Sequence, residues 1–177
     1  FTPDYLAGIY IGHLPIEEVL FFVVVPYNFI FIYLVFQAYF PQRNTRAIGS
    51  VFQWLIGLSS LLIAIIYLVK PGIGATLGYF QYYTISATLI AFLFTLLTFK
   101  KSWYGDFAVS FFICLIPFFI VNGILTGSIT KFPIVWYDEI HMIGWRMGTI
   151  PFEDLFYNYD LLLPLTWLFQ NFRRKHM

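Results

Sequence analysis

Two sequence motifs place paired carboxyl groups directly before apolar stretches. They read Pro15-Ile16-Glu17-Glu18 and Pro151-Phe152-Glu153-Asp154. A carboxyl at an apolar boundary is desolvated, which favours its neutral form, and adjacent carboxyls disfavour double ionisation. One member of a pair can then donate a proton while its neighbour remains a base. The motifs therefore predict general acid–base chemistry, although acids also occur at helix starts simply because they interact well with the helix dipole.

Two further polar side chains follow the motifs at helical spacing. Asp160 lies about two turns beyond Glu153, and Asn28 lies about three turns beyond Glu17, so each shares a helix face with its acid. An acid inside an apolar helix is costly and is usually functional. Both side chains are therefore candidates to support the site. For Asp160, a hydrogen bond between helices is the alternative.

The segment before the second motif adds Trp136, Tyr137, His141 and Arg146 as candidates. Tryptophan and tyrosine are expected at membrane interfaces in any case. His141 can be a proton shuttle or a plain polar contact, and Arg146 can pair with a carboxylate and hold it ionised. We expect no metal site.

The composition shows which environment has to position these residues. Of the 177 residues, 60% are hydrophobic and only 11% are charged, whereas soluble domains have about 25% charged residues. A soluble domain of this size cannot hide so much apolar surface. The net charge of +1 gives no case for nucleic-acid binding. The single Cys114 excludes a disulfide framework within the chain.

Five apolar segments are each long enough to cross a bilayer, which takes about 20 residues. They run over Leu14–Phe40, Gly49–Val69, Thr76–Phe99, Gly105–Leu125 and Pro151–Gln170. We therefore predict an all-α integral membrane protein with five transmembrane helices in this chain.

Charge is distributed unequally between the two faces that five crossings define. One face collects seven of the ten basic residues: Arg43, Arg46, Lys100, Lys101, Arg173, Arg174 and Lys175. The positive-inside rule places this face, with the C-terminus, in the cytoplasm. Eight of the nine acids lie on or nearest to the opposite face, with Asp106 as the exception. We expect a multi-pass protein of the cell membrane with its acidic motifs near the non-cytoplasmic face.

The chain also repeats itself. Besides the two motifs, Gly8 matches Gly144 and Gly12 matches Gly148 at the same offset of 136 residues. The match suggests a duplication, with residues 1–48 as part of the first half-repeat, 49–70 as a linking helix and 71–177 as the second half-repeat. Two helices precede the second motif in its half, so we expect two more before the first, giving seven helices in a three-plus-one-plus-three plan.

These residues carry a family resemblance. Pro15-Ile16-Glu17-Glu18 followed by Leu20-Phe21-Phe22 resembles the motif of the heterodimeric-type lycopene cyclases. Trp136-Tyr137 with Gly144 and Ile150-Pro151-Phe152-Glu153-Asp154 resembles it again. In that family the two halves are separate subunits or are fused in one chain, and this chain is similar to the fused form. The resemblance implies a seven-helix membrane enzyme that closes the linear end groups of lycopene into β-ionone rings, yielding γ-carotene and β-carotene.

The implied reaction is an isomerisation without net redox chemistry and without a cofactor. It requires a neutral carboxylic acid, a carboxylate base, a dry cavity and aromatic faces that tolerate a carbocation. We expect Glu17, Glu18, Glu153 and Asp154 to form one composite catalytic site, and the sequence leaves open which is acid and which is base. The expected supporting residues are Asn28, Phe21, Phe22, Trp136, Tyr137, His141, Arg146, Tyr157 and Asp160.

Other functions fit the chain less well. A retinal-binding photoreceptor needs a lysine in its last helix, and Pro151–Gln170 has none. A protease with paired glutamates would need an arginine where Phe22 stands, and neither the aspartate-rich motifs of prenyltransferases nor a G-x-G-x-x-G dinucleotide motif occurs. A carotenoid-binding protein without enzymatic activity and a proton-coupled transporter remain as alternatives. The expected partners are a linear carotenoid, the lipid bilayer and other enzymes of the carotenoid pathway.

Overall fold

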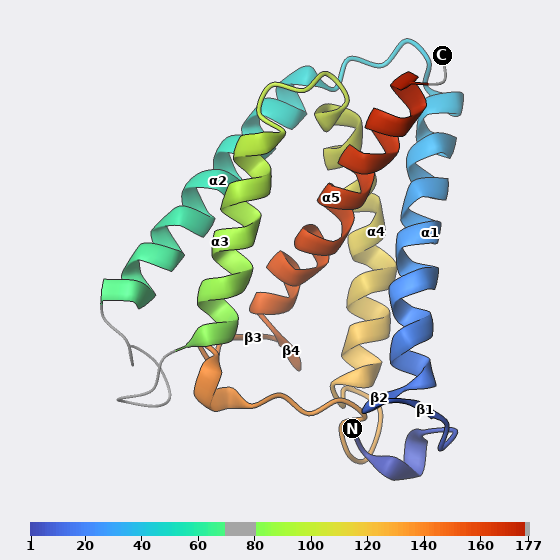
Figure 1. Ribbon diagram of the computed structural model, residues 1–177, viewed down its shortest axis with the longest axis vertical. Coiled ribbons are helices and arrows are strands. Elements are labelled where there is room, and N and C mark those ends of the chain that lie inside the picture. The colour runs from blue at the N-terminus through green and yellow to red at the C-terminus, as the bar shows by residue number, and fades with distance from the viewer. Residues whose placement is uncertain (70–80, 176–177) are drawn as a thin grey trace.

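The protein is a bundle of five helices in the computed structural model, which describes residues 1–69 and 81–175 (Figure 1). The helices are α1 (Ile16–Tyr39), α2 (Arg46–Val69), α3 (Tyr82–Leu97), α4 (Tyr104–Leu125) and α5 (Glu153–Lys175). The prediction of a mostly helical protein is therefore confirmed. The first part of the predicted segment Thr76–Phe99, residues 76–80, lies outside the described residues.

Three of these helices are long and apolar enough to cross a membrane: α1, α2 and α4. The described part of α3 is apolar but shorter. α5 begins with Glu153 and Asp154, contains Asp160, and ends in Arg173-Arg174-Lys175. The helices therefore fit a membrane protein, with three spans identified by length and composition among the described residues.

The helices pack as a closed ring around one aromatic core. α2 packs on α3 and α4, α3 packs on α5, and α1 packs on both α4 and α5. α1, α3 and α5 run in one direction and α2 and α4 in the other (Figure 1). The buried core includes Phe52, Tyr104, Phe107, Phe111 and Tyr159. Because α1 and α5 are parallel neighbours, their acidic first turns lie at the same end of the bundle.

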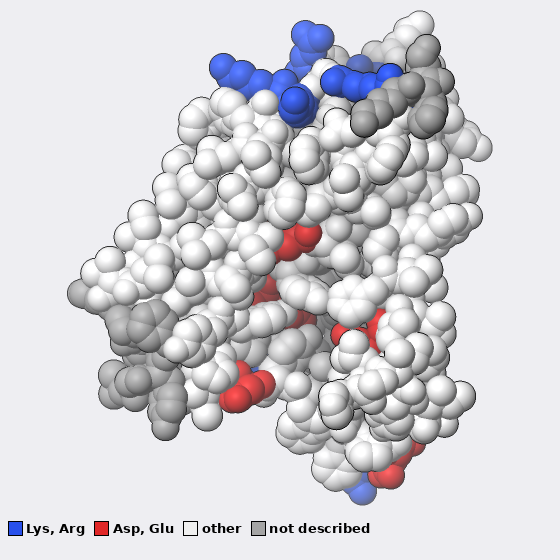
Figure 2. All heavy atoms as spheres, viewed as in Figure 1, with Lys and Arg blue, Asp and Glu red and all other residues white. Residues whose placement is uncertain are grey.

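Charged side chains separate toward the two ends of the bundle. Figure 2 shows most of the visible Lys and Arg where α2 and α4 begin and α5 ends, whereas the visible Asp and Glu lie at mid-height and below, several of them inside a hollow. Asp106 is the exception because it accepts hydrogen bonds from Gln37 (2.9 Å), Thr45 (2.8 Å) and Arg43 Nε (2.7 Å) at the basic end. The hydrogen bond to Asp106 raises the pKa of Arg43, and the three bonds together hold α4 to the link between α1 and α2.

Each acidic helix start is preceded by the same short hairpin. β1 (Tyr10–Ile11) pairs with β2 (Leu14–Pro15) before α1, and β3 (Arg146–Met147) pairs with β4 (Ile150–Pro151) before α5. These strands were not predicted.

The two hairpins match in detail. Their registers, Tyr10 with Pro15 and Arg146 with Pro151, are equivalent at an offset of 136 residues. Gly12 (φ 63°) and Gly148 (φ 67°) begin the two turns in the left-handed conformation, which glycine adopts without strain. The same local structure therefore presents both acid pairs to the bundle.

α2 and α4 approach closely where both begin. A Cβ on Gly49 would lie 2.6 Å from Gly105 Cα, and a Cβ on Gly105 would clash with the Thr45 carbonyl oxygen. A Cβ on Gly57, which also lies on α2, would have only an ordinary contact, 3.4 Å from the Thr95 side chain. The small residues at this crossing let the two backbones meet, as is typical of helix packing in membranes.

We predict that Gly105→Ala lowers the free energy of unfolding by about 1–3 kcal/mol, the usual cost of overpacking. Gly57→Ala is the matched control. It should leave the stability equal or slightly higher, since alanine favours helix by about 1 kcal/mol over glycine. Unfolding of both variants in detergent checks this, and equal stabilities for the two would contradict the close crossing.

Candidate active site

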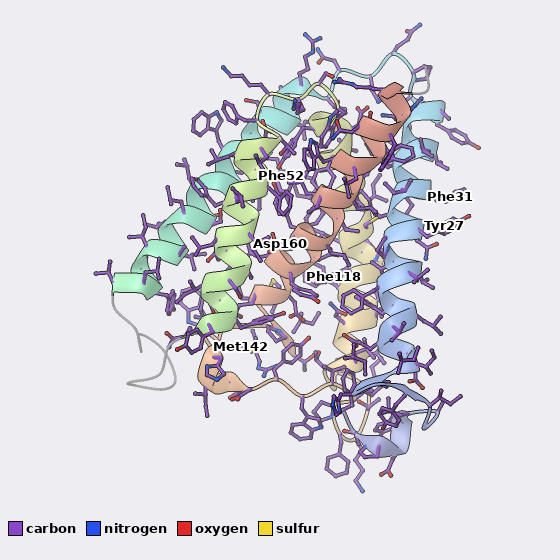
Figure 3. All side chains as sticks on the ribbon, in the orientation of Figure 1. Tyr27, Phe31, Phe52, Phe118, Met142 and Asp160 are labelled. Carbon is purple, nitrogen blue, oxygen red and sulfur yellow. The ribbon has the colours of Figure 1, made fainter. Side chains whose placement is uncertain are left out.

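One carboxyl from each motif lines a shared cavity between α1, α4 and α5. The cavity has a volume of about 260 Å³, and both Glu18 of α1 and Asp154 of α5 line it. Most other lining residues are apolar or aromatic: Phe21, Tyr83, Phe118, Leu125, Val135, Tyr137, Tyr157 and Leu161. Figure 3 places Phe118 on α4 beside α5. The two motifs thus bring one acid each to a single, mostly apolar cavity.

Asp154 is buried and held by two tyrosine hydroxyls. Tyr137 donates to Oδ2 at 2.7 Å, and Tyr83 donates to Oδ1 at 3.4 Å. Burial, and then the charge of the Asp154 carboxylate, raise the pKa of Tyr137. The Tyr137 hydroxyl therefore keeps its proton and remains a hydrogen-bond donor to this carboxyl.

Glu153 turns to the other side of α5, toward α3. Its side chain is almost wholly enclosed, since the residue is 1% exposed. Oε1 accepts hydrogen bonds from the Thr84 hydroxyl and from the Ile143 backbone N–H, both at 2.6 Å. Oε2 is buried and has no hydrogen-bond partner among the described residues. Glu153 and Asp154 therefore occupy separate surroundings although they are adjacent in the chain.

Glu17 faces a second, larger cavity. This cavity of about 430 Å³ is lined by residues of α1, α4 and α5, including Glu17, Asn28 and Cys114. Glu17 is exposed, and its Oε1 accepts a hydrogen bond from the Ala7 backbone N–H at 2.7 Å. Four residues line both cavities and mark their boundary: Phe21, Phe118, Asn122 and Asn158.

Several predicted supporting residues lie at these cavities. Asn28 lines the larger one, Phe21 lines both, and Tyr157 lines the smaller one. Phe22 packs edge-to-face against Phe21, with 5.7 Å between ring centroids. Tyr157 packs against Tyr83 at 6.1 Å.

Three predicted residues have partners away from the cavity acids. Trp136 is exposed and donates its indole N–H to Thr2 at 2.8 Å. Arg146 pairs with a carboxylate, as the sequence suggested, but its partner is Glu139 at 2.7 Å. His141 lies 4.0 Å from Asp138 and packs on the Tyr82 ring. These residues belong to the segment between α4 and β4, with Arg146 in β3 itself.

Asp160 lies farther from the acidic end of the bundle than the other acids of α5. Figure 3 shows it at mid-height, on the stretch of α5 that passes α3. Its Oδ1 atom is buried and has no hydrogen-bond partner among the described residues. The alternative role that the sequence allowed, a hydrogen bond between helices, is therefore absent at this atom.

The sequence did not identify four residues of the site as functional. They are Tyr83, Thr84, Asn122 and Asn158, and none of them was among the candidate residues. Their common signal is a polar group within an apolar helix near the acidic end, which is unusual in a membrane segment. Asn158 is the clearest case because it is buried, lines both cavities and has an amide nitrogen without a partner among the described residues.

The geometry permits proton transfer to an apolar molecule. Two carboxyls from facing helices share an apolar cavity, and aromatic rings surround them. Among the described residues, no group of three or more His, Cys, Asp or Glu side chains is placed to hold a metal ion. The titratable side chains that line the smaller cavity are carboxyls and phenolic hydroxyls.

We predict that Thr84→Val lowers the free energy of unfolding by about 1–3 kcal/mol, because Glu153 loses a buried hydrogen-bond donor. Thr88→Val is the matched control. Thr88 is equally buried on α3, but its hydroxyl bonds only to carbonyls of its own helix, so its loss should cost less. Denaturant unfolding in micelles measures both, and a Thr88 effect as large as that of Thr84 would refute the assigned bond.

A comparison with protein families identifies the chain. The family model described as lycopene cyclase matches residues 1–36 and 80–172. The unmatched part between these ranges includes α2, the helix predicted to link two half-repeats. No curated protein and no solved structure matches significantly. The matched ranges cover most of the chain and contain both acid motifs with their hairpins, so the chain belongs to the lycopene cyclase family, whose general activity is cyclisation in carotenoid biosynthesis.

Proposed function

We propose that the protein cyclises the linear end groups of lycopene to β-ionone rings by acid–base catalysis, without redox chemistry. The observation that carries this proposal is the cavity shared by Glu18 and Asp154. Its apolar and aromatic lining suits a hydrocarbon end group. The family match supports the general reaction, and the carboxyl pair supplies the proton chemistry that it needs.

The proposed steps balance without a co-reactant. A neutral carboxyl adds its proton to C2 of the end group, which leaves a tertiary cation at C1. The C5–C6 double bond attacks C1, so the C1–C6 bond forms and the positive charge moves to C5. A carboxylate then removes the proton from C6, and the new C5–C6 double bond completes the β-ring. One proton enters and one leaves, so substrate and product are isomers.

The hydrogen bonds of the two acids suggest their roles. Asp154 accepts from two phenolic hydroxyls, which stabilise a carboxylate and suit a base. Glu18 is half-buried and accepts no hydrogen bond from the described residues. No hydrogen bond therefore stabilises its carboxylate form against protonation. We assign Glu18 as the acid and Asp154 as the base. Phe21 and Phe118, which line the same cavity, stabilise the cation through their ring faces.

We predict that Glu18→Gln and Asp154→Asn each lower conversion by about 100-fold or more, the usual contribution of a general acid or base. Asp138→Asn is the control, because it makes the same acid-to-amide change at an exposed site. The assay is the pigment of lycopene-producing cells, separated by chromatography. Wild-type β-ring yield from both cavity variants would refute the assignment.

The same assay separates the alternative functions. A carotenoid-binding protein or a proton-coupled transporter would leave lycopene unchanged even in the wild type. The cells would then stay red instead of turning orange-yellow.

We further propose that the chain contains a duplication with the half-repeat boundaries expected from the sequence. The two matched hairpins support this, and so does the unequal covering of α1 and α5. Val23 and Tyr27 correspond to Tyr159 and Leu163 at the offset of 136 residues. The α5 residues are both 0% exposed, whereas Val23 is 62% and Tyr27 is 72% exposed.

The uncovered face of α1 suggests where a further helix packs. Tyr159 bonds to Thr95 of α3 at 2.7 Å, and Figure 3 shows Tyr27 and Phe31 directed away from the bundle. α3 covers the equivalent face of α5. We propose that a further helix covers this face of α1 in the same way in the full-length protein, in a seven-helix plan. We also propose that α3 and α5 span the membrane, with the basic end in the cytoplasm.

We predict that a cysteine at Tyr27, in a Cys114→Ala background, reacts with a lipid-soluble maleimide in the 177-residue chain but is protected in the full-length protein. Leu58→Cys is the control, because exposed Leu58 lies on α2, which has no counterpart in the repeat. It should react equally in both. Equal labelling of Tyr27→Cys in the two forms would exclude the covering helix.

A further inference from the structure

A polar pocket at the basic end lies apart from the acid-lined cavities. It has a volume of about 660 Å³ and is formed by the start of α2, the link between α3 and α4, and the start of α4. Three cationic residues line it, Arg46, Lys100 and Lys101, and no acid does. None of the three forms an ion pair with another described residue. The pocket therefore presents uncompensated positive charge.

Neutral hydrogen-bonding groups accompany these cations. Ser50 and Ser102 also line the pocket. The nearest carboxylate in the sequence, Asp106, is occupied by Arg43, Gln37 and Thr45. A bound anion would thus meet hydroxyl groups and cations without meeting a free carboxylate.

Two helix N-termini add to the positive electrostatic potential of this pocket. α2 contributes Arg46, Gly49 and Ser50 from its first turns, and α4 contributes Tyr104 and Gly105 from its own. The close Gly49–Gly105 crossing brings these two starts together. Helix N-termini carry partial positive charge and favour bound anions.

The backbone at Lys100 is unusual and helps to build the pocket. Lys100 has φ of 56° and is the only non-glycine residue with a positive φ among those that the structure describes. Glycine normally occupies such a position after a helix, because other residues are strained there. The Gln53 side chain holds this turn by accepting the Lys100 backbone N–H at 3.3 Å. Strain of this kind is often kept where function needs it, and here it lies in the turn that lines the pocket.

An aromatic wall adjoins the charges. Trp54 and Phe99 both line the pocket and pack edge-to-face with 5.5 Å between ring centroids. The Lys100 ammonium lies 5.5 Å from the Phe99 ring centroid, and Trp54 is exposed. Tryptophan at this depth is typical of the membrane interface, where headgroups meet acyl chains. An occupant with both a charged and an apolar part fits this site better than a free inorganic anion.

We propose that this pocket binds the phosphate headgroup of an anionic phospholipid, with its glycerol and acyl region against Trp54 and Phe99. Basic pockets between membrane helices commonly bind such headgroups. This inference is independent of the proposed cyclisation, because it uses none of the acid-lined site. If the basic residues served only to orient the protein in the membrane, all cations at this end would contribute alike to the binding of an anionic lipid.

The experiment compares cations inside and outside the pocket. The probe is fluorescent phosphatidylglycerol, titrated into the detergent-purified chain, with fluorescent phosphatidylcholine as the neutral-headgroup comparison. Lys100→Gln combined with Lys101→Gln should weaken phosphatidylglycerol binding by about tenfold or more, since each basic residue near a headgroup contributes measurably. Arg173→Gln combined with Arg174→Gln removes the same charge at the same end but outside the pocket, and should change binding less than about twofold.

A second variant separates charge from folding. Lys100→Gly keeps the left-handed turn, which glycine adopts more easily, so the thermal midpoint should not fall while binding weakens. Unchanged lipid binding in this variant would overturn the proposal. So would equal losses from the two double variants, equal binding of both lipids, or inorganic phosphate that binds as tightly as phosphatidylglycerol.

Discussion

The bundle depends on one constraint: a carboxyl group in an apolar interior is costly unless donors or a cation compensate it. The protein meets it in different ways. Asp106 is paired with the Arg43 guanidinium and with two neutral donors, which joins α4 to the α1–α2 link. Glu153 and Asp154 receive only hydroxyl and amide donors, and Glu153 Oε2 and Asp160 Oδ1 have no partner among the described residues. The first arrangement stabilises a carboxylate as part of the structure, whereas the second contains the carboxyls that we propose to exchange protons.

This difference organises the molecule from end to end. At the basic end, the glycines of the α2–α4 crossing and the Arg43–Asp106 pair hold the helix starts close together. At the acidic end, the helices line two adjoining cavities whose boundary is formed by aromatic and amide side chains. Two hairpins of the same register deliver both acid pairs to that end. The close helix crossing and the cavities of the proposed active site are therefore at opposite ends of the same helices.

The sequence predicted the helices from their long apolar segments, and it predicted from the matched Pro-x-acid-acid starts that the two motifs lie at the same end of the bundle. It could not predict which acid of each pair faces the cavity. The rotation of α5 about its own axis turns Glu153 toward α3 and Asp154 toward the cavity, and only the packing of the helices sets this rotation. The roles of Thr84 and Tyr83 were also hidden, because their partners lie about 70 positions away in the chain. Arg146 was expected to pair with a carboxylate, but only tertiary structure selected Glu139. The hairpin strands are two residues long, too short for an alternating pattern.

The Arg43–Asp106 pair also sets an order for assembly. Arg43 precedes its partner by 63 positions, and α2 and α3 lie between them, so the pair cannot form until α4 has been synthesised. α5 is made later still, and it carries the acids that Thr84, Tyr83 and Tyr137 satisfy. The Arg43–Asp106 pair can therefore form during synthesis, while the acid-lined cavities wait for the last helix. A nascent chain can thus hold this pair before Glu153 and Asp154 have been made.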